Sequence, residues 1–208
     1  MNLVNQLLYF VLVTSKKYNI DESHGLTHSI NVLHFANELF EYESVLHPRI
    51  KNHDKIIYIS AALHDMCDKK YMDVNDGIHD IEEFLQDKLV PNEINIVKQI
   101  VSTMSYSKVK KDGFPHLGQF QNAYNIVREA DLLTAYDFDR CIVYNMHCKG
   151  NNIDAAYNEA YDLFHTRVFQ HENDGLLTTD YSKAKHIVLK NIALERMNSW
   201  RKILHKKL

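Results

Sequence analysis

The sequence predicts an all-α protein, and two observations lead to that prediction. Apolar residues recur at three- and four-residue spacing over long stretches, as they do on one face of an α-helix. Only six Gly and three Pro interrupt the 208 residues, which is too few for the frequent turns of a β protein. The length suits one domain that buries a sizeable core. We therefore expect a single helical domain over residues 1–208.

The first four helices are expected near residues 2–18, 25–42, 50–67 and 77–88. The apolar stretch from Leu7 to Val13 marks the buried face of the first helix and is too short to cross a membrane. Gly25 and the polar residues before it separate the first two helices, and Pro48 precedes the third.

Four more helices are expected near residues 92–105, 119–147, 153–171 and 180–204. Pro91 suits a first helical turn, and Asn151-Asn152 can cap the seventh helix. The segment 108–118, with two Gly and one Pro, is expected to be a loop. An aromatic stripe after residue 150 reads as core, so we expect helices at about 150–205 to pack on a core of about 20–140. The stripe consists of Tyr157, Tyr161, Phe164 and Val168.

Charge and cysteine content exclude several classes of function. The formal net charge is −3, and no Lys/Arg cluster with interleaved aromatic residues is present, so a general nucleic-acid surface is not expected. Three cysteines without a CxxC pair indicate neither a disulfide framework nor a cysteine zinc site. We expect a cytoplasmic protein without a membrane partner, and a homo-oligomer is compatible with the sequence.

In the segment from Ile56 to Tyr71, a histidine and an aspartate stand side by side where the apolar residues give way to polar ones. Burying the imidazole of His64 beside the carboxylate of Asp65 is costly unless both are satisfied. One divalent cation satisfies both, because it accepts the imidazole lone pair and pairs with the carboxylate. The pair therefore predicts a metal site that needs further ligands.

Two other residues are placed to supply those ligands. His28 shares a predicted helix face with Val32 and Ala36, and Asp131 shares one with Tyr124 and Val127. This gives two imidazoles and two carboxylates on three predicted helices. Such a mixed set suits Mn²⁺, Fe²⁺, Zn²⁺, Co²⁺ or Ni²⁺ and, less well, Mg²⁺.

The segments HSINVLHFA, ALHDMCDKKY and READLLTAYD resemble, in this order, the three motifs of the HD-domain metal-dependent phosphohydrolases. IVSTMSYSK, residues 100–108, resembles a connecting segment of the branch that includes bacterial nucleotide pyrophosphohydrolases. The resemblance spans about residues 20–140. It implies a helical HD fold, one divalent metal held by His28, His64, Asp65 and Asp131, and hydrolysis of a small phosphorylated substrate, a nucleotide in that branch.

Further residues receive roles from the same pattern. In the family an acidic residue after the His-Asp pair takes part in catalysis, and Asp68 matches it, acting with Asp65 at the metal. Phosphate charge requires cationic or hydrogen-bonding partners. The nearest candidates in sequence are His24, Lys69, Lys70, Lys108 and Arg128.

Two alternatives stay open. Asn31 and Leu132 depart from the motifs of the nucleotide branch, which favours a catalytically weak nucleotide-binding or regulatory HD module as the second hypothesis. A di-iron oxygenase on the same fold is the third and needs additional histidine ligands. His79 and His116 are the candidates for them, but their sequence contexts do not match.

Overall fold

The computed structural model of the protein describes residues 2–150 and 152–206, and all regular secondary structure in this part of the chain is helical. The predicted all-α class is thereby confirmed. The chain divides into two compact units, Met1–Asp131 and Leu132–Leu208. The expected single domain, with the C-terminal helices packed on the core, stays a prediction.

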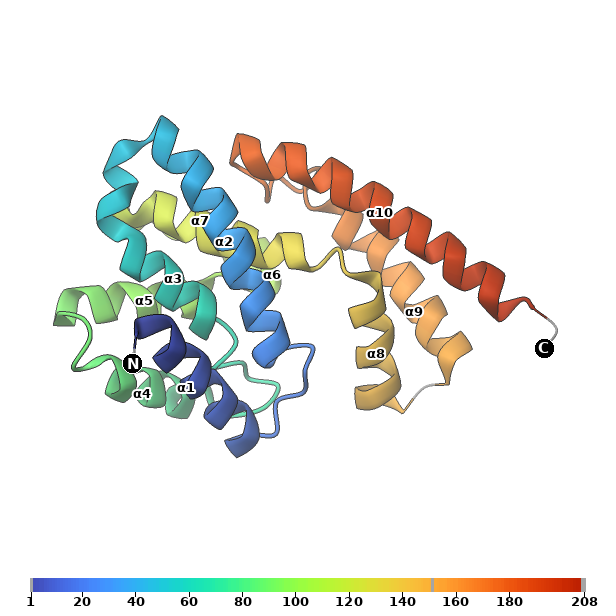
Figure 1. The fold of residues 1–208 in the computed structure, drawn as a ribbon, viewed down its shortest axis with the longest axis horizontal. Coiled ribbons are helices and arrows are strands. Elements are labelled where there is room, and N and C mark those ends of the chain that lie inside the picture. The colour runs from blue at the N-terminus through green and yellow to red at the C-terminus, as the bar shows by residue number, and fades with distance from the viewer. Residues whose placement is uncertain (1, 151, 207–208) are drawn as a thin grey trace. The chain divides into compact units, whose positions relative to one another are not determined.

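The first unit contains six α-helices, two short 3-10 helices and most of a seventh α-helix within its described residues (Figure 1). Their starts follow local chemistry: the side chain of Asn2 accepts a hydrogen bond from the backbone N–H of Asn5, and Asp73 accepts one from Asn75. The elements are α1 (Leu3–Lys17), α2 (Leu26–Leu46), η1 (Pro48–His53), α3 (Asp54–Leu63), α4 (Val74–Leu85), α5 (Pro91–Thr103), α6 (Tyr106–Asp112), η2 (Gly118–Phe120) and α7 (Gln121–Thr134).

Helix α3 lies at the centre of the first unit. Seven of its ten residues are buried, from Ile56 and Ile57 to the unbroken run from Ile59 to Leu63. Helices α1, α2 and α5 all pack against it (Figure 1). A helix covered from several sides has to be apolar around most of its circumference, which explains the apolar run that precedes His64.

The second unit consists of α8 (Phe138–Lys149), α9 (Ile153–Thr166), η3 (Val168–Gln170) and α10 (Asp180–Leu204). The three long helices pack against one another. Their shared core includes Tyr157, Phe164 and Val168, with Tyr161 packed at its edge, so the aromatic stripe is core, as predicted. The side chain of Asn152 caps α9, whereas Asn151 lies outside the described residues.

The expected helix at 119–147 is wrong, because the chain breaks there. Helix α7 ends at Thr134, and α8 begins at Phe138. Asp137 has an extended backbone, and its side chain accepts the N–H of Arg140 as an N-cap. The apolar pattern continues across this break, so periodicity alone did not reveal it.

Two further boundaries differ from expectation. The expected loop at 108–118 begins as α6, which Gly113 ends with a φ of 77°. The expected helix at 50–67 begins as the 3-10 helix η1 and ends at Leu63, so that residues 64–67 form a turn. Among the described residues, no helix combines the length and apolar character that a membrane crossing requires.

Candidate metal centre

The four predicted metal ligands come together in the first unit. His28 lies in the first turn of α2, His64 and Asp65 lie in the turn that follows α3, and Asp131 lies in α7. Helices α2 and α3 pack against each other, which brings the start of α2 to the end of α3. Segments more than 100 residues apart in sequence thus supply one site.

The donor atoms of these residues converge. His28 Nε2 lies 3.0 Å from His64 Nε2. Asp65 Oδ2 lies 3.3 Å from His28 Nε2 and 3.2 Å from His64 Nε2. Asp131 Oδ1 lies 3.3 Å and 3.7 Å from the same two nitrogens. Donors bound at about 2.0–2.2 Å from one ion are separated by about 3.0–3.5 Å, so these spacings fit a shared cation.

One oxygen gives an independent test of this fit. Asp65 Oδ2 is buried and makes no hydrogen bond within the described part of the chain, although two imidazole nitrogens lie within 3.3 Å of it. A buried carboxylate oxygen left in this way costs free energy. The atoms of His28, His64 and Asp65 lie where a cation could bind all three, so the group could hold a metal ion.

The backbone of α3 orients the imidazole of His64. Its Nδ1 lies 2.9 Å from the carbonyl oxygen of Ala61, to which an N–H at this position donates. In the neutral ring this hydrogen bond leaves the lone pair on Nε2, the atom that faces His28 and Asp65. The last turn of the buried helix therefore sets both the direction and the tautomer of this candidate ligand.

Without a metal, the surroundings of His64 favour the protonated form of its imidazole. Burial disfavours a charged imidazole, but the carboxylates of Asp65 and Asp131 outweigh burial and raise the pKa of His64 to about 9. Burial likewise acts to raise the pKa of Asp65 and Asp131, yet the neighbouring imidazoles hold the pKa of both carboxyls below its usual range. Opposite charges thus stabilise one another where a cation would otherwise do so.

The centre opens on its carboxylate side. The imidazole side chains of His28 and His64 are each 2% exposed, whereas those of Asp65 and Asp131 are 16% and 28% exposed. A ligand that enters from solvent therefore meets the carboxylates, while the histidines form the floor.

A glycine allows α4 to approach the turn that carries His64 and Asp65. A Cβ atom at Gly77 would lie 2.7 Å from both Met66 O and Cys67 Cα. These are backbone atoms that cannot yield as a flexible side chain can. Gly77 thus lets α4 pack directly behind the candidate ligands.

His24 lies beside the centre in a hydrogen-bonded network. Its ring is 6.1 Å from that of His28. Its Nδ1 lies 2.7 Å from Ser23 Oγ and 3.0 Å from the hydroxyl of Tyr71, which donates to Asp21. The network joins the segment before α2 to the loop after the His64-Asp65 turn.

Asp68 and Lys70 lie in that same loop. Asp68 accepts a 2.9 Å hydrogen bond from the backbone N–H of Lys70, and the Lys70 ammonium donates to His24 Nε2 at 3.0 Å. Lys69 is exposed. The structure therefore joins His24, Asp68 and Lys70 in one cluster next to the metal group.

The other two predicted substrate contacts lie in different surroundings. The Lys108 ammonium donates to the carbonyl oxygen of Ser102, near the end of α5, and acts electrostatically on Cys67. The side chain of Arg128 is 2% exposed, pairs with Glu129 at 3.0 Å and stacks on Phe114. In this structure the contacts of Arg128 are therefore with buried residues of the first unit, and its role as a substrate contact stays a prediction.

Sequence reasoning missed Asp21, Tyr71 and Gly77. Asp21 and Tyr71 are 50 residues apart, and neither belongs to a recurring pattern that marks it. Gly77 carried a signal, since a glycine inside a helix costs stability unless packing requires it.

Comparisons with known proteins bear on the fold. No protein-family model matches the chain, and no curated protein matches it. A solved structure from Lactobacillus plantarum, a structural-genomics target, is similar over 98% of this chain and 99% of its own, with a TM-score of 0.69 and 18% sequence identity. At this identity the likeness shows the all-α fold alone.

Proposed function

We propose that this protein is a metal-dependent phosphohydrolase of the HD-domain type that acts on a small phosphorylated molecule, a nucleotide in the first instance. The observation that carries the proposal is the convergence of two imidazole nitrogens and two carboxylate oxygens, with donor separations of 3.0–3.7 Å. The order of the motifs along the chain supports the same family.

The donor set would hold one divalent cation through His28, His64, Asp65 and Asp131. Such a cation, when bound, supplies a water of lowered pKa and polarises a phosphoryl oxygen. The bond to Ala61 keeps the Nε2 lone pair of His64 directed at the centre. Asp65 and Asp131 compensate the positive charge.

The cluster beside the centre would handle substrate and protons. The ammonium of Lys70 and the imidazole of His24 lie 3.0 Å apart and offer donors to the oxygens of a phosphate group. Asp68 Oδ2 lies 3.8 Å from the Lys70 ammonium, so its carboxylate can accept a proton beside the bound phosphate. Lys69 can add positive charge from the exposed side of the loop.

A paired set of histidine variants on α2 tests the metal. Elemental analysis of the purified protein should give about one transition metal per chain, and His28→Ala should remove it. His34→Ala is the matched control, because its exposed imidazole lies on the same helix and pairs only weakly with Glu38 at 3.6 Å. A folded wild-type protein that retains no divalent metal after supplementation would overturn the proposal.

A hydrolysis panel tests the chemistry. With added Mn²⁺, release of phosphate or pyrophosphate from nucleoside mono-, di- and triphosphates should occur with the wild type and His34→Ala. Asp65→Asn should lower it at least a hundredfold. Asp68→Asn should lower kcat more than metal content, which separates a proton-transfer role from metal binding.

One observation favours the second candidate, a nucleotide-binding or regulatory module with little turnover. Arg128 is buried against Glu129 and Phe114, so among these residues only His24 and Lys70 would neutralise the charge of a bound phosphate. Fewer cationic contacts to the phosphate would mean weaker stabilisation of a transition state and hence slow turnover. Saturable nucleotide binding without hydrolysis, over the same panel and metals, would select this candidate.

A further inference from the structure

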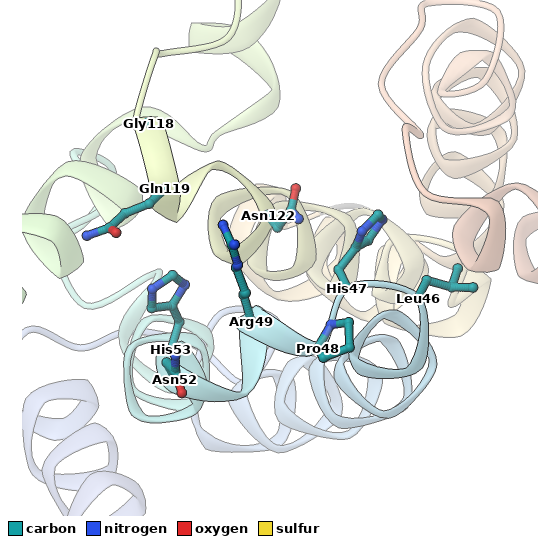
Figure 2. Close-up of a pocket in the computed structure, with 9 residues that line it drawn as sticks. All are labelled: Leu46, His47, Pro48, Arg49, Asn52, His53, Gly118, Gln119 and Asn122. Carbon is teal, nitrogen blue, oxygen red and sulfur yellow. The ribbon is translucent and has the colours of Figure 1, made fainter.

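A polar cleft lies at the other end of the α2–α3 pair from the metal group. It has a volume of about 540 Å³ and lies between the η1 connection and the start of α7 (Figure 2). His28 and Leu46 mark the two ends on α2 and are 18 residues apart. At about 1.5 Å per residue this separates the cleft from the centre by roughly 27 Å, so the two are distinct sites.

The guanidinium and amide side chains of the cleft have no hydrogen-bond or ion-pair partners among the described residues. Arg49 rises from η1 toward the opposite wall, between the histidines on either side (Figure 2). Within residues 2–150 and 152–206, no hydrogen bond or ion pair engages the side chains of Arg49, Asn52, Gln119 or Asn122. None of the lining residues is acidic. Four exposed side chains that carry hydrogen-bond donors therefore line this cleft.

His53 adds a donor or acceptor at the floor. Its ring packs on Phe120 with centroids 4.6 Å apart, and its buried Nδ1 has no hydrogen-bond partner in the described part of the chain. A buried ring nitrogen without a partner costs free energy unless a ligand or water satisfies it. The ring of His53 thus forms part of the wall of the cleft, while its Nδ1 is closed to solvent.

The electrostatics of the surrounding backbone favour an anion. His53 is the N-cap of α3 and provides no side-chain cap, but Asp54 in the first turn bonds to the N–H of Lys55, so only part of the positive charge of this helix end stays near the cleft. Gly118, at the start of η2, leaves open space where a side chain would stand. Three nearby carboxylates lie outside the lining: Glu43 is 3.8 Å from His47, Glu93 acts electrostatically on His53, and Asp54 lies in the first turn of α3.

We propose that this cleft binds the phosphate group of a small anionic molecule, at a site separate from the metal centre. The donors come from three segments, residues 47–49, 52–53 and 118–122, and so approach from several directions. A tetrahedral phosphate has three terminal oxygens that can use donors from several directions, whereas a planar carboxylate has two in one plane. The guanidinium of Arg49 supplies the charge-assisted, bidentate contact.

Backbone amide NMR on the full chain tests this site. Inorganic phosphate and AMP, titrated separately, should shift the amide signals of residues 47–53 and 118–122 in a saturable manner. Arg49→Ala should weaken binding at this cleft at least tenfold, and Gln119→Ala should weaken it severalfold. Lys51→Ala is the matched control, because Lys51 is an exposed cation of the same 3-10 helix that does not line the cleft, and it should leave binding within twofold.

The location of the shifts separates the two sites. Shifts confined to residues around His64, or equal binding by the wild type and Arg49→Ala, would overturn the proposal. Citrate that shifts the cleft signals more strongly than phosphate would overturn the assignment to phosphate. Arg49 and Gln119 are exposed, so both variants should keep the melting temperature of the wild type, and this is checked in parallel.

Discussion

The orientation of His64 follows from a single backbone contact. Its Nδ1 meets the carbonyl oxygen of Ala61 at 2.9 Å, and its Nε2 meets His28 at 3.0 Å. Two ring nitrogens that both present a lone pair would repel each other, so in the metal-free centre one of them carries an N–H that donates to the other. Burial opposes a charge on His64, but the carboxylates of Asp65 and Asp131 favour it and raise the pKa of this imidazole.

The stability of the metal-free protein should therefore depend on pH. The pKa of His64 is about 9 in the fold against 6.5 in an unfolded chain. Its stabilising contribution is complete below about pH 6.5 and is lost as the pH rises through about 9. In the presence of a chelator, the melting temperature should fall over this interval.

The Asp65→Asn variant provides the comparison. It removes a carboxylate that raises the pKa of His64, so the fall in melting temperature should be smaller, while His34→Ala should retain the full fall. With metal present the trend should reverse, since binding displaces the proton and strengthens as the pH rises. Melting temperatures of the metal-free wild type that stay constant from pH 6.5 to 9 would contradict this account.

At the scale of elements, the close approach of α4 to the turn after α3 depends on Gly77. In Gly77→Ala the new methyl group would overlap Met66 O and Cys67 Cα, and either α4 or the turn must move. We expect a loss of about 1–3 kcal/mol in the free energy of unfolding, as for an overpacked core, together with reduced metal content.

Asn75→Ala is the control for that variant, because Asn75 is an exposed residue of the same helix. Chemical denaturation and elemental analysis measure the two effects. A Gly77→Ala protein with unchanged metal content and unchanged stability would show that α4 does not support the turn.

In the second unit, Asp139 ties α8 to α10. The single N–H of Arg196 Nε is shared between the two carboxylate oxygens of Asp139, at 2.7 and 3.0 Å, and the indole N–H of Trp200 donates to the same carboxylate at 2.7 Å. Burial acts to raise the pKa of Asp139, but these donors lower it overall. Asp139→Asn should cost about 1 kcal/mol, a value reduced for the exposure of the pair.

The stability that Asp139→Asn removes should depend on pH. The stabilisation is present above the ordinary aspartate pKa of 3.8 and is lost as the pH falls through the lowered value. The difference in denaturation midpoint between the wild type and Asp139→Asn should thus narrow below about pH 4. Asp162→Asn is the control, because Asp162 is an exposed aspartate in the interior of α9; its denaturation midpoint should stay close to that of the wild type above and below pH 4.

The sequence predicted which segments are helical more accurately than it predicted where each helix ends. The stripe with Tyr157 and Phe164 was assigned correctly to a core, because side-chain spacing on a helix is a local property. The break at Asp137 was missed, because its cap competes with an apolar pattern that continues through Phe138. The short helix α6 was missed as well, since Gly113 and Pro115 lie close to its end and favour a loop.

At the scale of the whole molecule, the candidate metal centre belongs entirely to the first compact unit, Met1–Asp131. Metal binding should therefore slow the hydrogen exchange of backbone amides in the first unit. In hydrogen exchange, added Mn²⁺ should slow the amides of α3 and of the first turns of α2, whereas the amides of α9 should change little.

Cys141 and the other residues of α8 provide the internal control in that experiment, since they lie in the second unit. Equal protection of both units would contradict a metal site confined to the first. Loss of the effect in His28→Ala, but not in His34→Ala, would link it to the candidate ligands.

The sequence by itself determined the all-α class and the four residues that meet at the centre. Periodicity, the scarcity of Gly and Pro and the placement of His28, His64, Asp65 and Asp131 on apolar faces are local properties, readable along the chain. The sequence did not determine that Tyr71 would reach Asp21, that Gly77 would lie against Cys67, or that Arg49 and Gln119 would line the same cleft. These residues come from segments that lie 10 to 70 positions apart in the sequence, and only the packing of helices around α3 brings them together.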